Sequence, residues 1–286
     1  MTYSIVGRDE ASGELGVAVQ SRAFGVGLCA WARPGVGAIA TQAFSERSYG
    51  PLGLERLAAG ESPEDSLAQL LAEDERRDYR QVAFLAADGR TAAHTGAACI
   101  PDCGHVTRSG VSAQGNMLAS PAVWFAAADT FAATEGTLAE RLLAALDAAE
   151  DAGGDFRGRE SAALLVVSGD PEDKPWQPVF DLRVESGPEP LRELRRLHGI
   201  AAAYRRRDDF DDRTDVEEEV DLAQKAGLPP DQVAFTAALV AVAHGDLDEA
   251  ATRLRPIGES DPRWRETLER YVRLGAMPQA VLDRLA

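Results

Sequence analysis

The stretch Thr2-Tyr-Ser-Ile-Val-Gly-Arg-Asp-Glu-Ala-Ser-Gly-Glu-Leu-Gly-Val-Ala-Val-Gln-Ser-Arg22 predicts a β-hairpin at the start of the chain. Tyr3 and Ile5 alternate with other residues, Asp9–Gly13 supply a turn, and Leu15–Val19 form an apolar run. A small residue at position 2 favours removal of the initial methionine, which would make Thr2 the first residue. Thr2 would then carry both a hydroxyl and an α-amine, whose ordinary pKa is about 8 rather than the 10.4 of lysine. Such a residue can act as nucleophile and base together.

The Met-Thr start alone does not identify a nucleophile, because many cytosolic chains begin in this way. Ser4 is the alternative if the methionine is retained. Residues two apart on a strand share a face, so Ser4 lies on the same side of the hairpin as Thr2.

Composition limits the class of protein. The 286-residue chain is 45% hydrophobic, enough to bury a full core, and exceeds the usual size of one domain. Its 47 acidic and 30 basic residues give a net charge of −17, which repels nucleic acid and anionic membranes, so we expect neither as a partner. Whether this acidity reflects coding bias or a saline habitat stays open.

Targeting signals and cysteine use predict a cytoplasmic protein. The sequence shows no basic-then-apolar leader and no apolar run of about 18 residues. Three cysteines, an odd number in a long chain, suit a reducing compartment better than a disulfide framework.

The order of predicted elements indicates an α+β sandwich. Strands are expected at 2–8, 14–20, 24–31, 35–43, 82–87, 91–95, 111–115, 161–168 and 178–185, and helices near 51–59, from 62 onward, at 121–134 and at 138–152. Strands and helix pairs in this order suit two antiparallel sheets between helical layers, a four-layer αββα body, rather than a doubly wound parallel sheet. No glycine-rich dinucleotide or P-loop signature follows a strand, and we expect no cofactor.

The chain changes character after Gly187-Pro188-Glu-Pro190, which predicts two domains, 1–187 and 188–286. Amphipathic helices are expected at 215–226, 230–244, 247–255, 262–274 and 278–285. The stretch from Ala238 to Pro262 resembles the second half of one tetratricopeptide repeat. About three such repeats are needed to stand alone, so we expect this small all-α domain to dock on the first domain or on a partner protein.

Several segments of the first domain resemble the prokaryotic family named Domain of Unknown Function 1028. These segments are Thr2–Arg22, Thr41–Gly50, Ile100–His105, Ala113–Leu118 and Gly153–Val167. The resemblance covers roughly residues 1–187 and implies the fold of the N-terminal nucleophile (Ntn) hydrolases, which is the αββα sandwich. It brings no established substrate. In that family, helical tails of this kind are sometimes labelled peptidoglycan-binding.

A looser resemblance to proteasome-type Ntn subunits implies catalytic roles. Their return strand ends in Asp-Ser-Arg, where this chain has Gln20-Ser21-Arg22. Their lysine beside the nucleophile is matched most nearly by Arg33, which can stabilise an alkoxide but cannot give up its proton at neutral pH. Their oxyanion turn resembles Gln114–Asn116, and the acid that holds the terminal amine resembles Asp155. The resemblance therefore implies Thr2, Arg33, Asn116 and Asp155 as catalytic residues.

Chemistry gives separate reasons for two of these residues and leaves alternatives. A Gly-Asn turn offers a backbone N–H and the side-chain amide of Asn116 to an oxyanion, although an ordinary strand-to-helix turn has the same sequence. Asp155 follows a helix end and could instead pair with Arg157 or Arg159.

Four residues are candidates for substrate binding: Arg47, Tyr49, His105 and Gln114. Arg47 could bind a carboxylate with two hydrogen bonds, and the alternative is a helix-entry loop. His105 lies in a predicted loop, where binding groups are common on rigid sandwiches. With Cys99 and Cys103 it could supply three zinc ligands, but no fourth ligand is evident and we expect no metal.

We therefore expect an Ntn-type amidohydrolase that acts on a small amide or peptide-like metabolite through Thr2. The alternative is a non-catalytic ligand-binding sandwich whose helical tail is an interaction module. Self-association stays open in both cases.

Overall fold

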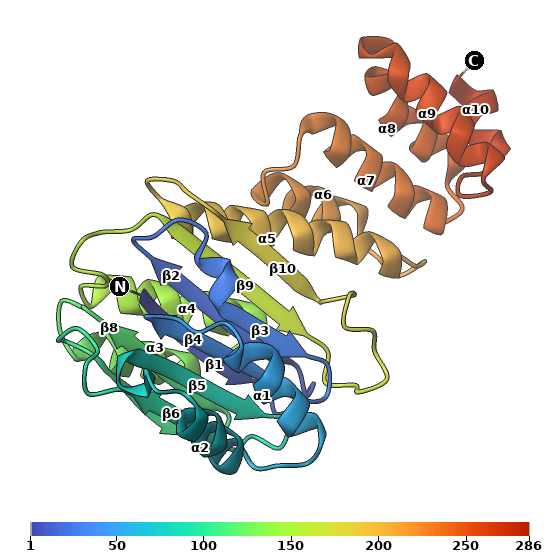
Figure 1. Ribbon diagram of the computed structural model, residues 1–286. Coiled ribbons are helices and arrows are strands. Elements are labelled where there is room, and N and C mark those ends of the chain that lie inside the picture. The colour runs from blue at the N-terminus through green and yellow to red at the C-terminus, as the bar shows by residue number, and fades with distance from the viewer. Residues whose placement is uncertain (1, 286) are drawn as a thin grey trace. The chain divides into compact units, whose positions relative to one another are not determined.

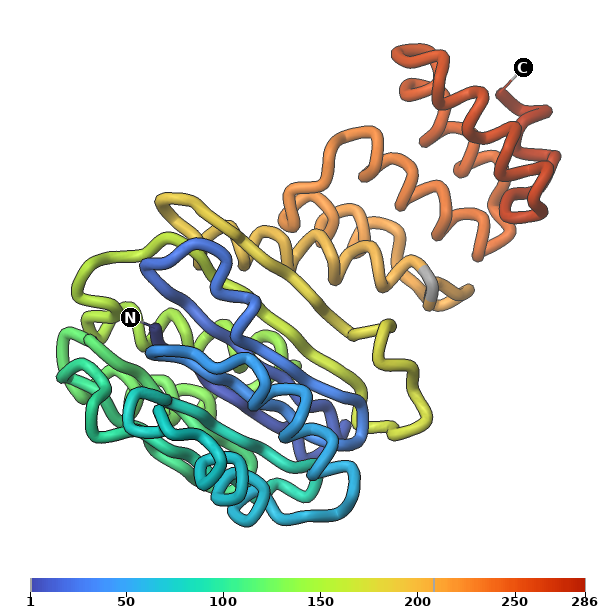
Figure 2. The backbone as a smooth tube through the Cα atoms, in the orientation of Figure 1, coloured from blue at the N-terminus to red at the C-terminus, as the bar shows by residue number. Residues whose placement is uncertain are grey.

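The structure is a computed structural model that describes residues 2–285, with the side chain of residue 208 excepted. The chain divides into two compact units, Met1–Arg195 and Arg196–Ala286. Figures 1 and 2 trace the first unit from blue to yellow and the second in orange and red.

Two antiparallel sheets form the centre of the first unit. The first sheet runs β10 (Phe180–Val184), β9 (Ser161–Val167), β2 (Leu15–Ser21), β1 (Thr2–Arg8), β8 (Val111–Asn116) and β7 (Gly104–Arg108). The second sheet runs β3 (Ala30–Arg33), β4 (Gly37–Ala43), β5 (Arg80–Ala86) and β6 (Thr91–Thr95). The predicted hairpin is confirmed, with Thr2 opposite Ser21 and Arg8 opposite Leu15.

Helices cover the outer face of each sheet. Helices α1 (Tyr49–Ala58) and α2 (Pro63–Glu73) pack on the four-stranded sheet, and α3 (Ala122–Ala133) and α4 (Leu138–Asp151) pack on the six-stranded sheet (Figure 1). The predicted helix N-caps are confirmed. Ser62 accepts a hydrogen bond from the Asp65 N–H, and Thr137 and Glu140 form a capping box. The predicted αββα order is therefore confirmed.

The apolar core between the sheets occupies only part of their facing surfaces. It contains Val6, Leu15, Val17, Val19, Ala38, Ala83, Leu85 and Val167. Because side chains alternate along a strand, Thr2 and Ser4 share the inner face with Val6, and Ser21 shares it with Val19. The inner face is thus apolar along most of β2, whereas on β1 it is apolar at Val6 and polar at the end where Thr2 lies.

Three elements differ from the sequence expectation. The strand expected at 24–31 is a 3-10 helix η1 (Val26–Cys29) followed by β3, because Gly25 takes a left-handed φ of 68° that breaks the extended chain. Strand β7 was not predicted, and it is a short edge strand that pairs only with β8. Helix α5 (Pro190–Arg206) was also not predicted, and it runs through the boundary of the two units.

The second unit is helical. It continues from α5 through η3 (Arg207–Asp209), α6 (Val216–Lys225), α7 (Pro230–Ala243), α8 (Leu247–Ser260), α9 (Pro262–Arg273) and α10 (Gln279–Leu285). Its largest core cluster includes Phe235, Leu254, Leu268 and Val281. Helix α8 does not end at 255 as predicted. It includes Pro256 and continues to Ser260.

Across residues 2–285, no helix combines the length and the apolar character that crossing a membrane requires.

Candidate functional site

A layer of buried polar side chains lies between the two sheets, at the end where β1 begins. Its members on the first sheet are Thr2, Ser4, Ser21, Gln114, Asn116 and Ser161, and those on the second are Gln42 and Gln81; all are less than 10% exposed. The strand register explains this gathering, since Thr2 lies opposite both Ser21 and Asn116. Polar groups are rarely collected in a sandwich core without a functional or structural demand.

Thr2 is held on three sides by this layer. Its hydroxyl donates to Oγ of Ser21 at 3.0 Å, and its carbonyl oxygen accepts from Nε2 of Gln42 at 3.1 Å. Its third neighbour is Asn116, its register partner on β8. Thr2 itself is 7% exposed. The first strand therefore delivers the hydroxyl into a polar, nearly dry environment, where hydrogen bonds are strengthened.

Gln81 joins the two sheets. Its Oε1 accepts from Nε2 of Gln42 at 2.7 Å and from Nδ2 of Asn116 at 2.9 Å. Its Nε2 contacts Oγ1 of Thr95 at 3.0 Å and the carbonyl oxygens of Gly104 and Gly115 at 3.1 and 2.7 Å. One buried amide thus fixes the side chains on either side of Thr2.

Two acceptors in this layer, Oε1 of Gln42 and Oε1 of Gln114, have no hydrogen-bond partner among the described residues, and neither has Oγ of Ser112, which lies next to the layer opposite Val6. Gln114 uses only its Nε2, which contacts Oγ of Ser4 and the carbonyl oxygen of Ala40, both at 3.3 Å. Buried acceptors without partners are costly unless water or a ligand reaches them. These acceptors are available to a water molecule or to a polar group of a ligand.

Backbone strain gathers at the same end of the sandwich. The non-glycine residues with positive φ in residues 2–285 are Ala43 (66°), Asp102 (48°) and Met117 (52°). Ala43 follows Gln42, Met117 follows Asn116, and the carbonyl oxygen of Asp102 accepts from the N–H of Leu118. Such conformations cost of order 1–3 kcal/mol each and cluster at functional sites, so their position supports a site here.

Asp155 lies beside the return strand rather than in the polar layer. Its carboxylate accepts from the backbone N–H of Arg22 at 3.1 Å and from that of Arg157 at 2.9 Å. It also pairs with the Arg157 guanidinium at 3.3 Å, while its side chain is fully buried. Arg22 directly follows Ser21, so the carboxylate lies next to the strand partner of Thr2. The ion-pair alternative drawn from the sequence is thus present in the structure.

Gln20, at the acid position of the implied Asp-Ser-Arg pattern, points away from Thr2. Strand alternation turns it to the outer face with Tyr3, toward the helices. It is fully buried, and neither side-chain polar atom has a partner among the described residues. Ser21, by contrast, contacts Thr2 directly.

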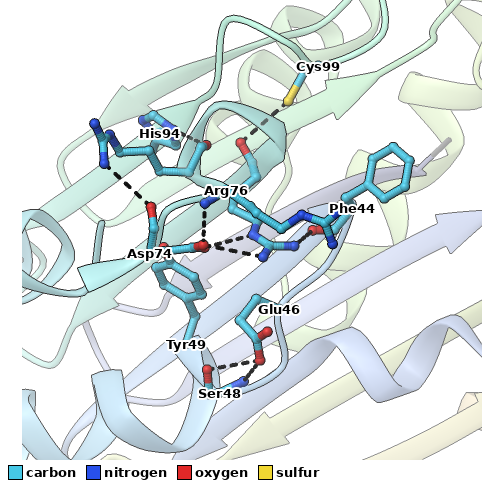
Figure 3. A network of polar contacts seen from close by, with 10 residues as sticks. Phe44, Glu46, Ser48, Tyr49, Asp74, Arg76, His94 and Cys99 are labelled. Atoms are coloured by element: carbon cyan, nitrogen blue, oxygen red, sulfur yellow. Dashed lines mark hydrogen bonds and ion pairs between the residues drawn. The ribbon is translucent and has the colours of Figure 1, made fainter. Parts of the chain in front are cut away.

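Tyr49 belongs to a network that anchors the loop between β4 and α1 (Figure 3). Its hydroxyl donates to Oδ2 of Asp74 at 3.2 Å, and Arg80 binds the same carboxylate at 2.7 and 3.3 Å and the Phe44 carbonyl oxygen at 2.7 Å. The Arg80 guanidinium lowers the pKa of Asp74, and burial, followed by the charge of Asp74, raises that of Tyr49. Tyr49 is 2% exposed, so its observed contacts support the fold.

His105 is connected to the polar layer from outside. It lies on β7, where its Nδ1 is 2.8 Å from Oγ1 of Thr95, the residue that Gln81 contacts. Desolvation by its neighbours lowers the pKa of His105, and the nearby His94 lowers it further. The sequence placed this residue in a loop, whereas the structure makes it an exposed strand residue.

Arg33 and Arg47 lie away from Thr2. Arg33 pairs with Gly37, at the opposite end of β4 from Gln42, so the strand length separates it from the polar layer. Arg47 is exposed on the loop before α1 and lines a groove that does not include Thr2.

The two cysteines of the Cys-x3-Cys-x-His pattern are not joined by a disulfide. Cys103 Sγ contacts the Cys99 carbonyl oxygen at 3.8 Å, and burial raises the pKa of both thiols. No set of three His, Cys, Asp or Glu side chains in the described part of the chain is arranged to hold a metal ion.

Sequence reasoning missed Gln42, Gln81 and Thr95, which connect Thr2 to Asn116 and His105. Gln42 and Gln81 interrupt otherwise apolar alternation on β4 and β5, where inner positions are Ala38, Ala40, Ala83 and Leu85. A polar residue at an expected core position is the signal that could have found them.

Comparisons with known proteins agree with the fold. Residues 2–194 match the model of a family described as "Family of unknown function (DUF1028)". A crystal structure of a protein from Silicibacter pomeroyi that carries the same family description is 34% identical, with a TM-score of 0.63 over 69% of this chain and 87% of that one. No curated protein matches the chain.

Proposed function

This chain belongs to the DUF1028 family of unknown function, and we propose that it is an amide-bond hydrolase of the N-terminal nucleophile type, with Thr2 as its nucleophile. The observation that carries the proposal is the position of Thr2. It begins a central strand of an αββα sandwich and places its hydroxyl in a buried layer of amides and hydroxyls.

The proposed reaction requires removal of residue 1. The free α-amine of Thr2 would accept the hydroxyl proton while Oγ1 attacks the substrate carbonyl carbon. The amine would then pass this proton to the leaving nitrogen as the C–N bond breaks, leaving an ester on Thr2. Water would hydrolyse the ester, return the hydroxyl and release the acid.

The neighbours of Thr2 suit these steps. Ser21 accepts the Thr2 hydroxyl hydrogen bond and can orient Oγ1 before attack. Asn116 uses one side-chain N–H for Gln81, and we assign its second N–H to the oxyanion that forms on the substrate. Asp155, next to Ser21, supplies the negative charge that would hold a protonated amine at this strand end. Gln114 provides an acceptor for a polar substrate group.

The substrate class follows from the same features. The side chains of the polar layer are neutral amides and hydroxyls, which suit a small amide or peptide-like compound. Arg33 has no part in the proposal, because it lies on β3 opposite Gly37, at the end of β4 away from Gln42. The ligand-binding alternative keeps the same polar layer but needs no chemistry at Thr2.

Substitution at Thr2 tests the proposal. Thr2→Ala should reduce hydrolysis of a panel of acyl and aminoacyl p-nitroanilides by several orders of magnitude, because the hydroxyl and amine act as one unit. Thr2→Ser should keep measurable activity, since both groups remain. Asn116→Ala should lower kcat by about 10²–10³ if its amide binds the oxyanion. Thr107→Ala, on the exposed edge strand β7, is the matched control and should be unchanged.

Mass spectrometry supplies the second measurement. Intact protein should lack residue 1, and a β-lactone probe should label Thr2 in a peptide map. A protein that retains residue 1 and still hydrolyses the panel would overturn the N-terminal mechanism. Activity that survives Thr2→Ala but disappears in Ser4→Ala would move the nucleophile to Ser4, and inactivity of the wild-type protein toward every amide would favour the ligand-binding alternative.

A further inference from the structure

The two sheets of the first unit have unequal widths, and this leaves one strand uncovered. The first sheet has six strands and the second has four. Strand β3, at the end of the smaller sheet, packs against β2 and β9, so β10 extends beyond it. A groove of about 690 Å³ occupies the place that a fifth strand of the smaller sheet would fill. This volume lies within the range of small-molecule sites.

The groove has an apolar, aromatic lining. Leu165 of β9 lies on the inner face of its sheet yet is half-buried, whereas its inner-face neighbours Ala163 and Val167 are almost completely buried. Trp31 of β3 lines one wall. Trp176, on the loop between β9 and β10, lines another and is 76% exposed (the loop is yellow-green in Figure 2). The Trp31 indole also packs on Gly50 of α1, so Trp176 is the exposed indole, and it favours a flat apolar ligand that can stack on it.

The charges of the groove favour an anion. Asp181 and Arg183 on β10 bind each other at 2.8 and 3.2 Å and so neutralise one another. Arg47, at the other wall, is exposed and forms no ion pair with any carboxylate among residues 2–285. In a chain of net charge −17, the unpaired guanidinium of Arg47 gives this groove a positive group that can bind an anionic ligand.

We propose that the groove between β3 and β10 binds a small carboxylate with a flat apolar body, which stacks on Trp176 and pairs with Arg47. Aromatic stacking and a charge-assisted hydrogen bond act on different parts of such a ligand, so the site requires both parts. An uncharged analogue would keep the stacking and lose the ion pair.

This site is separate from the polar layer at Thr2. Leu165 lies four residues along β9 from Ser161, the inner-face residue opposite Ser21, which is about 13 Å at the usual strand rise. The 3-10 helix η1 separates the two places: Gly27 lines the groove, while the N–H of Val26 donates to Ser161 at 3.1 Å. We therefore expect binding in the groove to be independent of the proposed catalysis.

Fluorine NMR of full-length protein labelled with 5-fluorotryptophan tests the proposal. The chain has four tryptophans, so Trp124 in α3 and Trp264 in α9 serve as internal controls. Indole-3-acetate, titrated into the Thr2→Ala variant to exclude hydrolysis of amide probes, should shift only the Trp31 and Trp176 resonances. Indole-3-acetamide should bind more weakly, and tryptamine, which carries a positive charge, should bind more weakly still.

Two exposed substitutions separate the contributions. Arg47→Gln should weaken indole-3-acetate at least about tenfold and leave indole-3-acetamide nearly unchanged, because only the first probe uses the charge. Trp176→Ala should weaken both probes, and Arg90→Gln, on an exposed turn, should weaken neither. Equal shifts at all four tryptophans, no saturable shift at millimolar probe, or insensitivity to Arg47→Gln would overturn the proposal. Wild-type protein should bind as Thr2→Ala does, so the result does not depend on the activity of Thr2.

Discussion

At the scale of single residues, Gln81 organises the polar layer. It is completely buried and lies on the smaller sheet, yet it contacts Asn116 and two carbonyl oxygens of the larger one. An amide can do this because it donates and accepts at once. A leucine of similar size would fill the space and provide neither function.

We therefore predict that Gln81→Leu destabilises the protein by about 3 kcal/mol, because it leaves the amides of Gln42 and Asn116 without their shared acceptor. Urea unfolding followed by circular dichroism measures the change. Gln177→Leu, on an exposed loop, is the control and should stay within about 0.5 kcal/mol of wild type. If the two substitutions have equal effects, Gln81 does not hold the layer together.

At the scale of elements, the loop between β4 and α1 is fixed by the Asp74–Arg80 pair. Asp74 is the C-cap of α2 and Arg80 begins β5, and their side chains are 14% and 9% exposed. Arg80 also holds the Phe44 carbonyl oxygen, so the pair joins α2, β5 and the loop (Figure 3). This loop follows Gln42, which contacts Thr2.

The lowered pKa of Asp74, caused first by its hydrogen bond from Arg80, predicts a specific pH dependence. The ionised carboxylate contributes stability above its unfolded pKa of about 3.9, and this contribution disappears as pH falls through the lower folded value. Asp74→Asn should cost about 3 kcal/mol at pH 7, where it leaves Arg80 without its partner charge. The difference from wild type should shrink by pH 3. Urea unfolding at both pH values measures it, and the exposed Asp173→Asn should show no such convergence.

At the scale of the whole molecule, the contact boundary falls within α5. Its first residues belong to the first unit: Leu191 and Leu194 are buried, and Arg195 forms an ion pair with Asp147 of α4. The sequence placed the boundary at 187, where the proline and glycine residues lie, because composition shows where a chain turns and not where packing ends.

A fragment of residues 1–195 should therefore fold by itself and unfold in one cooperative transition. A fragment of residues 1–187 lacks Leu191 and Leu194, and we expect it to be less stable by about 2 kcal/mol or more. Differential scanning calorimetry of both fragments checks this. Equal stability would show that the start of α5 contributes nothing to the first unit.

The sequence by itself determined most of the first unit's elements and their layered order. Alternation, caps and turn residues act over a few positions, so Thr2–Arg22, Ser62–Asp65 and Thr137–Glu140 could be read locally. The second-unit helices were predicted for the same reason. Strand β7 and helix α5 were missed, since a short edge strand and a charged helix carry weak patterns.

Tertiary structure alone decided which polar residues meet. Gln42, Gln81 and Asn116 come from three strands on two sheets, and only sheet packing brings the amides of Gln42 and Asn116 within 3 Å of the Gln81 oxygen. Tertiary structure also places Arg33 opposite Gly37, at the end of β4 away from Gln42. It places Arg47 on the groove formed by the unequal widths of the two sheets. Local sequence fixes the direction a side chain takes from its own strand, whereas the neighbour it meets depends on how distant strands pair and pack.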